Sequence, residues 1–192
     1  MAVLLGLDID GVLCDIGPSV SARISDRFGV ASHPATWRTY DLRRLRIGVP
    51  EAHFHEFLDH TFADPDLYHH APLVEGVSAA MEALVDAGWD LVGITARAPE
   101  LAEATREWLV RHGLPLQSVH HAPMLEKSAV ARRLGVAATI EDNPEEAERL
   151  AEVCESWLFD RPYNRDHVSI RTRRLMSWGD GIGRLCQLRL FA

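Results

Sequence analysis

Residues 3–12 have the sequence VLLGLDIDGV, in which a short apolar run ends at a pair of carboxylates. A run of this length is typical of a buried strand, which we expect at Val3–Asp8. Open α/β sheets bind their ligands at the carboxyl ends of the strands, so Asp8 and Asp10 would lie at a binding edge. Gly11 permits the turn that brings both carboxylates to one site. The stretch predicts an α/β protein with its chemistry at the end of the first strand.

Strand-like and helical segments alternate from residue 74 onward. Further apolar runs predict strands over Trp89–Thr95, Ser118–Ala122, Ala137–Glu141 and Ser156–Asp160. Helical periodicity, with proline or glycine near the ends, predicts helices over Gly76–Ala87, Pro99–His112, Glu126–Leu134, Pro144–Val153 and Ser177–Leu190. This alternation predicts a doubly wound, mostly parallel sheet with helices on both faces.

Residues 15–73 interrupt the alternation. Their pattern predicts helices over Pro18–Phe28 and Pro50–Phe62, joined by a turn-prone stretch. A helical insert directly after the first strand would lie over the end of that strand. We therefore expect a catalytic core of residues 1–14 and 74–192, carrying a small helical cap formed by the insert.

The composition excludes several classes of protein. The chain has 192 residues, which suggests one domain or one domain carrying a sizeable insertion, and its 47% hydrophobic and 25% charged residues are typical of a globular protein. A net charge of −8 argues against a nucleic-acid binder. The apolar opening Met1–Leu7 is too short for a membrane span and lacks the basic start of a signal peptide. The three cysteines form no CxxC pair, so we expect a cytoplasmic protein without disulfides or structural zinc.

One lysine stands out in this composition. Of the 20 basic residues, 19 are arginines, and the remaining one is Lys127. A compact ammonium differs from the planar guanidinium fork, so the lone lysine indicates a position where arginine would not serve.

Other polar residues follow the later predicted strands. Thr95, at the end of the second strand, offers a hydroxyl, and the following Ala96 and Arg97 offer backbone N–H groups that suit a phosphate. Lys127 follows the third strand, and the pair Glu141-Asp142 closes the fourth. Each has an ordinary explanation as a helix cap or a surface charge. Together they occupy one edge of the sheet, which favours a shared site.

These motifs resemble the four motifs of the haloacid dehalogenase-like hydrolases: Asp-x-Asp-Gly at residues 8–11, a strand-end threonine, a later lysine and a strand-end acidic pair. The resemblance covers nearly the whole chain, and residues 15–73 match the helical cap that some members insert. It implies a Rossmann-like core. Residues 94–97, 140–144 and 159–164 more narrowly resemble the group related to 5′(3′)-deoxyribonucleotidases.

The resemblance also implies a role for each motif residue. Asp8 would attack phosphorus to form an aspartyl-phosphate, and Asp10 would act as the general acid and base. Mg²⁺ would be held by Asp8, the main-chain carbonyl of Asp10 and Asp142. Phosphate or substrate would be bound by Thr95, Ala96, Arg97 and Lys127. Glu141 and Asn143 would contact the residues that bind the metal and the phosphate and would hold them in place.

We therefore expect a Mg²⁺-dependent phosphomonoester hydrolase, with nucleoside 5′-monophosphates as the leading substrates. The same chemistry on another small phosphate ester, such as a sugar phosphate or a biosynthetic intermediate, is the nearest alternative. An inactive binding module on the same scaffold is a further one. The expected partner is a small phosphorylated molecule rather than a nucleic acid or a membrane, and a homodimer is left open.

Overall fold

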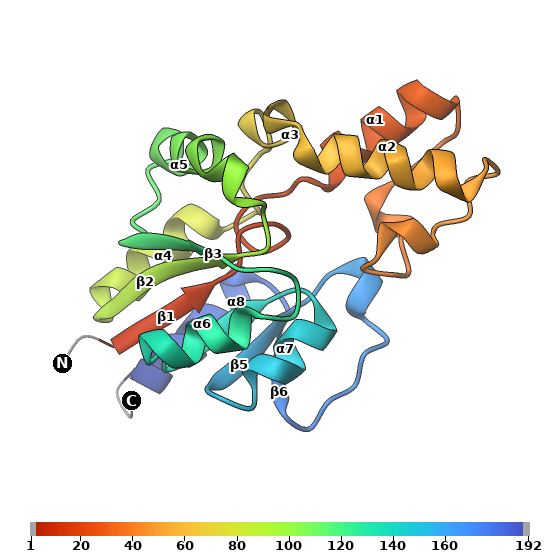
Figure 1. The fold of residues 1–192 in the computed structure, drawn as a ribbon. Coiled ribbons are helices and arrows are strands. Elements are labelled where there is room, and N and C mark those ends of the chain that lie inside the picture. The colour runs from red at the N-terminus through yellow and green to blue at the C-terminus, as the bar shows by residue number, and fades with distance from the viewer. Residues whose placement is uncertain (1–2, 190–192) are drawn as a thin grey trace.

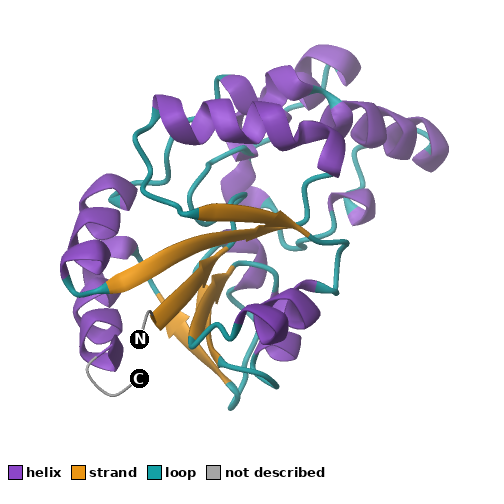
Figure 2. Ribbon diagram, turned by 60° about the vertical axis from the view of Figure 1, so that its left-hand side comes forward, coloured by secondary structure: helices purple, strands orange, loops and turns teal. Residues whose placement is uncertain are grey.

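A computed structural model describes residues 3–189 and contains a six-stranded parallel sheet in the order β3-β2-β1-β4-β5-β6 (Figures 1 and 2). The strands are β1 (Val3–Leu7), β2 (Trp89–Thr95), β3 (Ser118–His121), β4 (Ala138–Glu141), β5 (Glu155–Phe159) and β6 (Thr172–Leu175). The order reverses at β1, whose two neighbours are β2 and β4. This reversal makes the carboxyl end of β1 the point where an open sheet binds its ligand. The predicted α/β fold is confirmed.

Helices cover both faces of the sheet. They are α4 (Val77–Asp86), α5 (Ala102–Arg111), α6 (Lys127–Leu134), α7 (Pro144–Leu150) and α8 (Trp178–Arg189). Leu5 and Leu7 of β1 pack in one cluster with residues of α4, α5 and α8. Val92 and Ile94 of β2 pack in a second cluster with residues of α6 and α7. Successive side chains of a strand point to opposite faces of the sheet. Continuous apolar runs therefore suit a sheet that is covered by helices on both faces.

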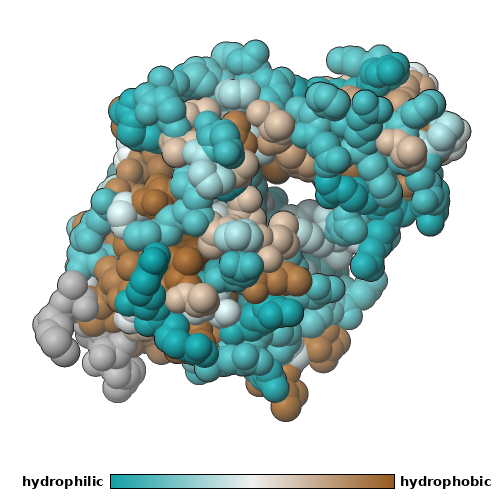
Figure 3. Space-filling view, viewed as in Figure 1, coloured by the Kyte–Doolittle hydropathy of each residue, from teal (hydrophilic) through white to brown (hydrophobic). Residues whose placement is uncertain are grey.

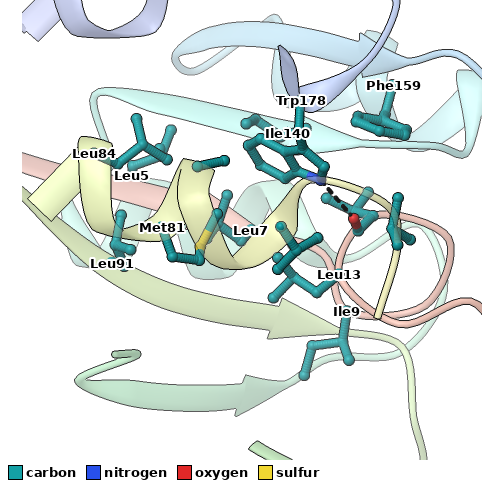
Figure 4. Packing of buried hydrophobic residues seen from close by; sticks show 14 of the residues in the cluster. Leu5, Leu7, Ile9, Leu13, Met81, Leu84, Leu91, Ile140, Phe159 and Trp178 are labelled. Atoms are coloured by element: carbon teal, nitrogen blue, oxygen red, sulfur yellow. Dashed lines mark hydrogen bonds between the residues drawn. The ribbon is translucent and has the colours of Figure 1, made fainter. Parts of the chain in front are cut away.

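The larger cluster also holds the turn that follows β1 (Figure 4). Ile9 and Leu13 in this turn are fully buried beneath the helices. The indole nitrogen of Trp178 donates a hydrogen bond of 3.0 Å to the carbonyl of Val12. Helix α8 therefore anchors the turn that carries Asp8 and Asp10.

Strand β6 was not predicted from the sequence. Its segment reads TRRL, and two central arginines do not resemble a buried strand. Because β6 lies at the sheet edge, these side chains reach acids of neighbouring segments: Arg173 pairs with Glu155, and Arg174 lies 3.0 Å from Asp160. The predicted helix at Pro99 begins instead as a 3₁₀ turn, η3 (Pro99–Leu101). Leu190, the predicted end of the last helix, lies outside the described residues.

Residues 15–73 form a helical layer over the carboxyl end of the sheet (Figure 1). Its elements are α1 (Gly17–Phe28), η1 (Pro34–Thr36), η2 (Leu42–Arg44), α2 (Glu51–Ala63) and α3 (Pro65–His69). Val20, Ile24 and Phe54 belong to a separate apolar cluster, in which Trp37 also packs. Neither α3 nor the 3₁₀ turns were predicted. No helix within residues 3–189 is long and apolar enough to cross a membrane.

Candidate active site

The turn after β1 depends on Gly11. Its φ of 84° lies in the left-handed region, which side chains rarely adopt. A Cβ atom at this position would also lie 1.8 Å from Oδ2 of Asp142. The backbone of the turn therefore approaches the end of β4 as closely as a residue without a side chain allows, which brings Asp8, Asp10 and Asp142 to one place.

Lys127 stands between two carboxylates at the centre of the site. Its ammonium nitrogen lies 2.7 Å from Oδ1 of Asp8 and 2.7 Å from Oε2 of Glu141. The lysine is 2% exposed, and both carboxylates are also buried. Since an ammonium has three donors, one donor remains for another oxygen atom. The structure thus brings together three residues that the sequence had placed on three different strand ends.

A buried glutamate fixes the loop that carries Lys127. The carboxylate of Glu146 accepts backbone hydrogen bonds of 2.5 Å from Leu125 and 3.1 Å from Lys127. Leu125 has a φ of 67°, an uncommon conformation for a residue with a side chain. Glu146 therefore satisfies the free N–H groups at the start of α6 and holds the ammonium in place.

Burial raises the pKa values of the carboxyls in this cluster. The pKa of Asp8 is about 8, because burial and the nearby Glu141 outweigh the attraction of Lys127. Burial likewise raises the pKa values of Glu141 and Asp142 to about 7 each. Burial alone would lower the pKa of Lys127, yet Asp8 and Glu141 raise it above its ordinary value. Lys127 and, beside Asp142, Arg161 are two cations for three buried carboxyls, so a bound metal ion would relieve an excess of negative charge.

We expect the metal-free protein to lose stability as the pH rises. The pKa values of Asp8, Glu141 and Asp142 are higher in the folded chain than in the unfolded chain, so the folded chain binds more protons. Its free energy of unfolding should therefore fall between about pH 4 and about pH 8. Melting temperatures in EDTA at about pH 6.5 and about pH 8.5 measure this fall, which added Mg²⁺ should reduce. An equal fall in Asp8→Asn would contradict the explanation.

The side chain of Asp10 is bound by Arg97 rather than by the lysine cluster. Nε and Nη2 of Arg97 donate hydrogen bonds of 2.9 and 2.7 Å to the two carboxylate oxygens. The backbone N–H of Arg97 donates to the hydroxyl of Thr95 at 3.2 Å. Thr95 is buried at the end of β2, and Ala96, half-buried beside it, lines the cavity described below. A direct contact between Arg97 and a substrate remains a prediction.

Asp142 has one occupied and one free oxygen. The phenol of Tyr163 donates a hydrogen bond to Oδ2, while buried Oδ1 has no hydrogen-bond partner among residues 3–189. The side-chain amide of Asn164 donates 2.8 Å hydrogen bonds to the carbonyls of Asp142 and Phe159. A free carboxylate oxygen that is buried needs a partner, and a divalent cation is the partner that this set of ligands suits.

Asp8, Glu141 and Asp142 each offer an oxygen atom, and these atoms lie within 4.8 Å of one another. Glu141 nevertheless has other partners. Its Oε2 receives Lys127, and its Oε1 accepts the backbone N–H groups of Asp142 and Asn143 at 3.2 and 3.0 Å. Asp8 and Asp142 are therefore the side chains that fit a cation, and Glu141 fixes the loop around them.

A cavity of about 940 Å³ opens over these residues, between the sheet and residues 15–73 (Figure 3). From the sheet side it is lined by Asp8, Asp10 and Asp142. From the helical side, Tyr40 reaches across, and its ring meets that of Tyr163 edge-to-face with the centroids 5.8 Å apart. The cavity suits a small molecule with an anionic end and an apolar or aromatic end.

Two residues of the site, Tyr163 and Glu146, were not predicted from the sequence to act there. Tyr163 and Glu146 act on Asp142 and Lys127 through hydrogen bonds across loops. The signal for Tyr163 was its place after the fifth strand, on the same edge as the other motifs. Nothing in the sequence distinguished Glu146 as a site residue, because an acidic residue in the first turn of a helix is common.

A model of a known protein family matches residues 2–189, nearly the whole chain. Its description is 5′ nucleotidase, deoxy (pyrimidine), cytosolic type C protein. The chain belongs to this family. It is therefore a phosphomonoester hydrolase of the haloacid dehalogenase superfamily, as the motifs predicted. Among curated proteins it is 26% identical over 175 residues to BH1399 of Halalkalibacterium halodurans, which is provisionally named a nucleotidase; the match covers 90% of this chain and 87% of that protein.

Solved structures share the fold at lower sequence identity. A haloacid dehalogenase family hydrolase from Deinococcus radiodurans, with bound phosphate and sodium, aligns over 97% of both chains with a TM-score of 0.62 and 18% identity. CbbY from Rhodobacter sphaeroides, in complex with xylulose-1,5-bisphosphate, aligns over 94% of this chain and 96% of its own with a TM-score of 0.57 and 16% identity. At these identities the likeness establishes the fold alone.

Proposed function

We propose that this protein hydrolyses nucleoside 5′-monophosphates in the presence of Mg²⁺, through a phosphoryl intermediate on Asp8. The observation that carries the proposal is the Asp8 carboxylate at the end of β1, which lies 2.7 Å from Lys127 and has an oxygen within 4.8 Å of a carboxylate oxygen of Asp142. A carboxylate nucleophile, the buried ammonium of Lys127 and a carboxylate oxygen of Asp142 without a hydrogen-bond partner among residues 3–189 are groups that suit phosphoryl transfer.

In the first step, the oxygen of Asp8 that does not contact Lys127 would attack phosphorus as the bond to the ester oxygen breaks. Lys127 would bind a phosphoryl oxygen with its remaining donor, and the Thr95 hydroxyl would bind another. Asp10 would give the departing alkoxide a proton. It would then take a proton from the water that attacks phosphorus, so that the bond to Asp8 breaks and phosphate leaves.

Asp8, Asp142 and the main-chain carbonyl of Asp10 would hold Mg²⁺. When bound, the ion supplies positive charge that offsets the charge on the phosphoryl oxygens as they move. Tyr163 supports this arrangement because it occupies one oxygen of Asp142 and leaves the other free.

The family match and the BH1399 relative support a nucleotide as the substrate. We propose that residues 15–73 act as a cap whose Tyr40 faces the base or sugar across the cavity. The family description is also the basis for proposing a cytoplasmic location.

A panel of phosphate esters tests the proposal. Phosphate release from ribo- and deoxyribonucleoside 5′-monophosphates, sugar phosphates and p-nitrophenyl phosphate should require Mg²⁺ and be abolished by EDTA. We expect the highest kcat/KM on a nucleotide. A higher value on a sugar phosphate would overturn the nucleotide assignment, and no release from any ester would favour an inactive binding module.

We expect Asp142→Ala to weaken the binding of Mg²⁺, because it removes a ligand and leaves Tyr163 without its acceptor. Calorimetric titration with Mg²⁺ should give a dissociation constant raised by about 10-fold or more, and raised Mg²⁺ should restore part of the activity. Glu145→Ala is the matched control, since it removes an exposed acid from the same cavity rim. Equal Mg²⁺ affinity in Asp142→Ala and the wild type would contradict the ligand assignment.

A further inference from the structure

Arg97 has a different environment from the exposed arginines of this chain. Its side chain is 1% exposed, whereas that of Asp10 is 23% exposed. The guanidinium binds both oxygens of Asp10 in a parallel fork, and Nη1 donates to the hydroxyl of Thr105 at 3.1 Å. Both residues line the cavity, but the arginine side chain is almost fully buried, and three of its nitrogen atoms already donate to Asp10 and Thr105.

The surroundings of Arg97 leave its guanidinium one orientation. The guanidinium group lies over the ring of Tyr68, and its carbon is 4.2 Å from the centroid of that ring. The same carbon is 5.9 Å from the ring centroid of Trp108. The phenol of Tyr68 donates to the carbonyl of Phe62, and the indole of Trp108 donates to the carbonyl of Ala71, both at 2.8 Å. Each aromatic ring is thus fixed by a hydrogen bond of its own.

The main chain of Arg97 is held as well. Its N–H donates to Thr95, and its carbonyl lies 2.9 Å from Nδ1 of His121 on β3. A residue fixed at both its main chain and its side chain can set the rotation of a bound carboxylate, because two parallel hydrogen bonds define a plane. A substrate phosphate would have to displace Asp10 to reach the same fork.

We infer that Arg97 is a positioning residue for Asp10, a role that replaces the substrate contact implied by the sequence resemblance. This inference rests on the proposed function, in which Asp10 transfers protons during both steps. Arg97 turns the carboxylate of Asp10 so that its open side faces the leaving oxygen and the attacking water. Tyr68 of α3 supports the guanidinium, which ties the orientation of Asp10 to the helical segment above the sheet.

The test compares two half-reactions of p-nitrophenyl phosphate in Arg97→Lys. p-Nitrophenolate departs without a proton, so phosphorylation of Asp8 should proceed at close to the wild-type rate. Release of phosphate needs Asp10 to activate water, and it should slow by about 10²-fold. Rapid-mixing absorbance should therefore show a burst of one nitrophenolate per chain followed by a slow steady state. On a nucleoside monophosphate, whose alkoxide needs a proton, the first step should slow as well.

Two comparisons separate positioning from damage to the fold. Asp10→Asn should give the same burst, and adding Arg97→Lys to Asp10→Asn should cause no further loss. Arg106→Lys is the matched control, because Arg106 binds Glu103 with a similar fork on the exposed side of α5. It should behave as the wild type does.

Thr105→Val keeps the arginine and removes only the hydroxyl that orients Nη1. It should slow phosphate release by about five-fold with the burst intact, and it serves if Arg97→Lys does not fold. Equal slowing of the burst and the steady state, wild-type kinetics in both variants, or a further loss in the double variant would each overturn the inference. A wild-type protein that hydrolyses no ester would overturn the proposed function instead.

Discussion

Asp8→Asn should abolish phosphate release while leaving the fold intact. The amide cannot attack phosphorus, and removing a nucleophile that acts together with other groups costs about 10⁴-fold or more in kcat. Burial raises the pKa of Asp8 to about 8, so its charged form is unfavourable in the folded chain. A neutral amide of the same shape should therefore not lower the melting temperature at neutral pH. Phosphate release and thermal unfolding of the same preparation measure both effects.

Asp59→Asn is the control for this substitution. Asp59 also lines the cavity, but it is exposed and pairs with Arg43. Its variant should keep the wild-type kcat within about two-fold, since exposed ion pairs contribute little. If Asp8→Asn kept substantial activity, another residue would have to be the nucleophile.

Lys127→Arg should lose most of its kcat although it keeps the charge. The ammonium lies 2.7 Å from both Asp8 and Glu141 and is almost fully buried, so the longer planar guanidinium would displace one of them. A displacement of about 1 Å in such a site costs around 10²-fold in rate. Overpacking of a buried site costs about 1–3 kcal/mol, so the melting temperature should fall by about 2–12 °C.

Arg132→Lys, the reverse exchange at an exposed position of α6, should be harmless. Kinetics measured well below the melting temperature separate the loss of rate from the loss of stability. Wild-type kinetics in Lys127→Arg would mean that any buried cation serves at this position.

The parallel sheet could be predicted because its central strands are buried on both faces. The apolar runs that form β1, β2 and β4 suit strands covered by helices on both faces, and their predicted ends agree with the structure to within a residue. The edge strand β6 was missed because its arginines are stabilised by acids that come near only in the folded sheet. Helix α3 is five residues long, too short for its periodicity to be recognised.

The candidate site was predicted to the same extent and for a similar reason. Strand ends meet at one edge of a parallel sheet, so Asp8, Thr95, Lys127 and Asp142 could be placed together from their order alone. The side chains that hold these residues in place through hydrogen bonds could not be predicted. Arg97 and Asp10 are 87 residues apart, and Tyr163 meets Asp142 across a loop. Such pairs depend on how loops and side chains pack, which local sequence patterns do not encode.

The transfer of a phosphoryl group to Asp8 is the central step of the proposed reaction. Asp10→Asn should accumulate this phosphorylated species with p-nitrophenyl phosphate and Mg²⁺, because the first step needs no proton transfer, whereas the second needs Asp10 to accept a proton from the attacking water. Borohydride reduces an acyl phosphate to an alcohol, so reduction after a rapid quench should convert residue 8 to homoserine, detected by peptide mass spectrometry. We expect homoserine at position 8 and unmodified residues elsewhere, and only when substrate is present. An unchanged Asp8 in protein that had released nitrophenolate, or a phosphoryl group on another residue, would contradict this step.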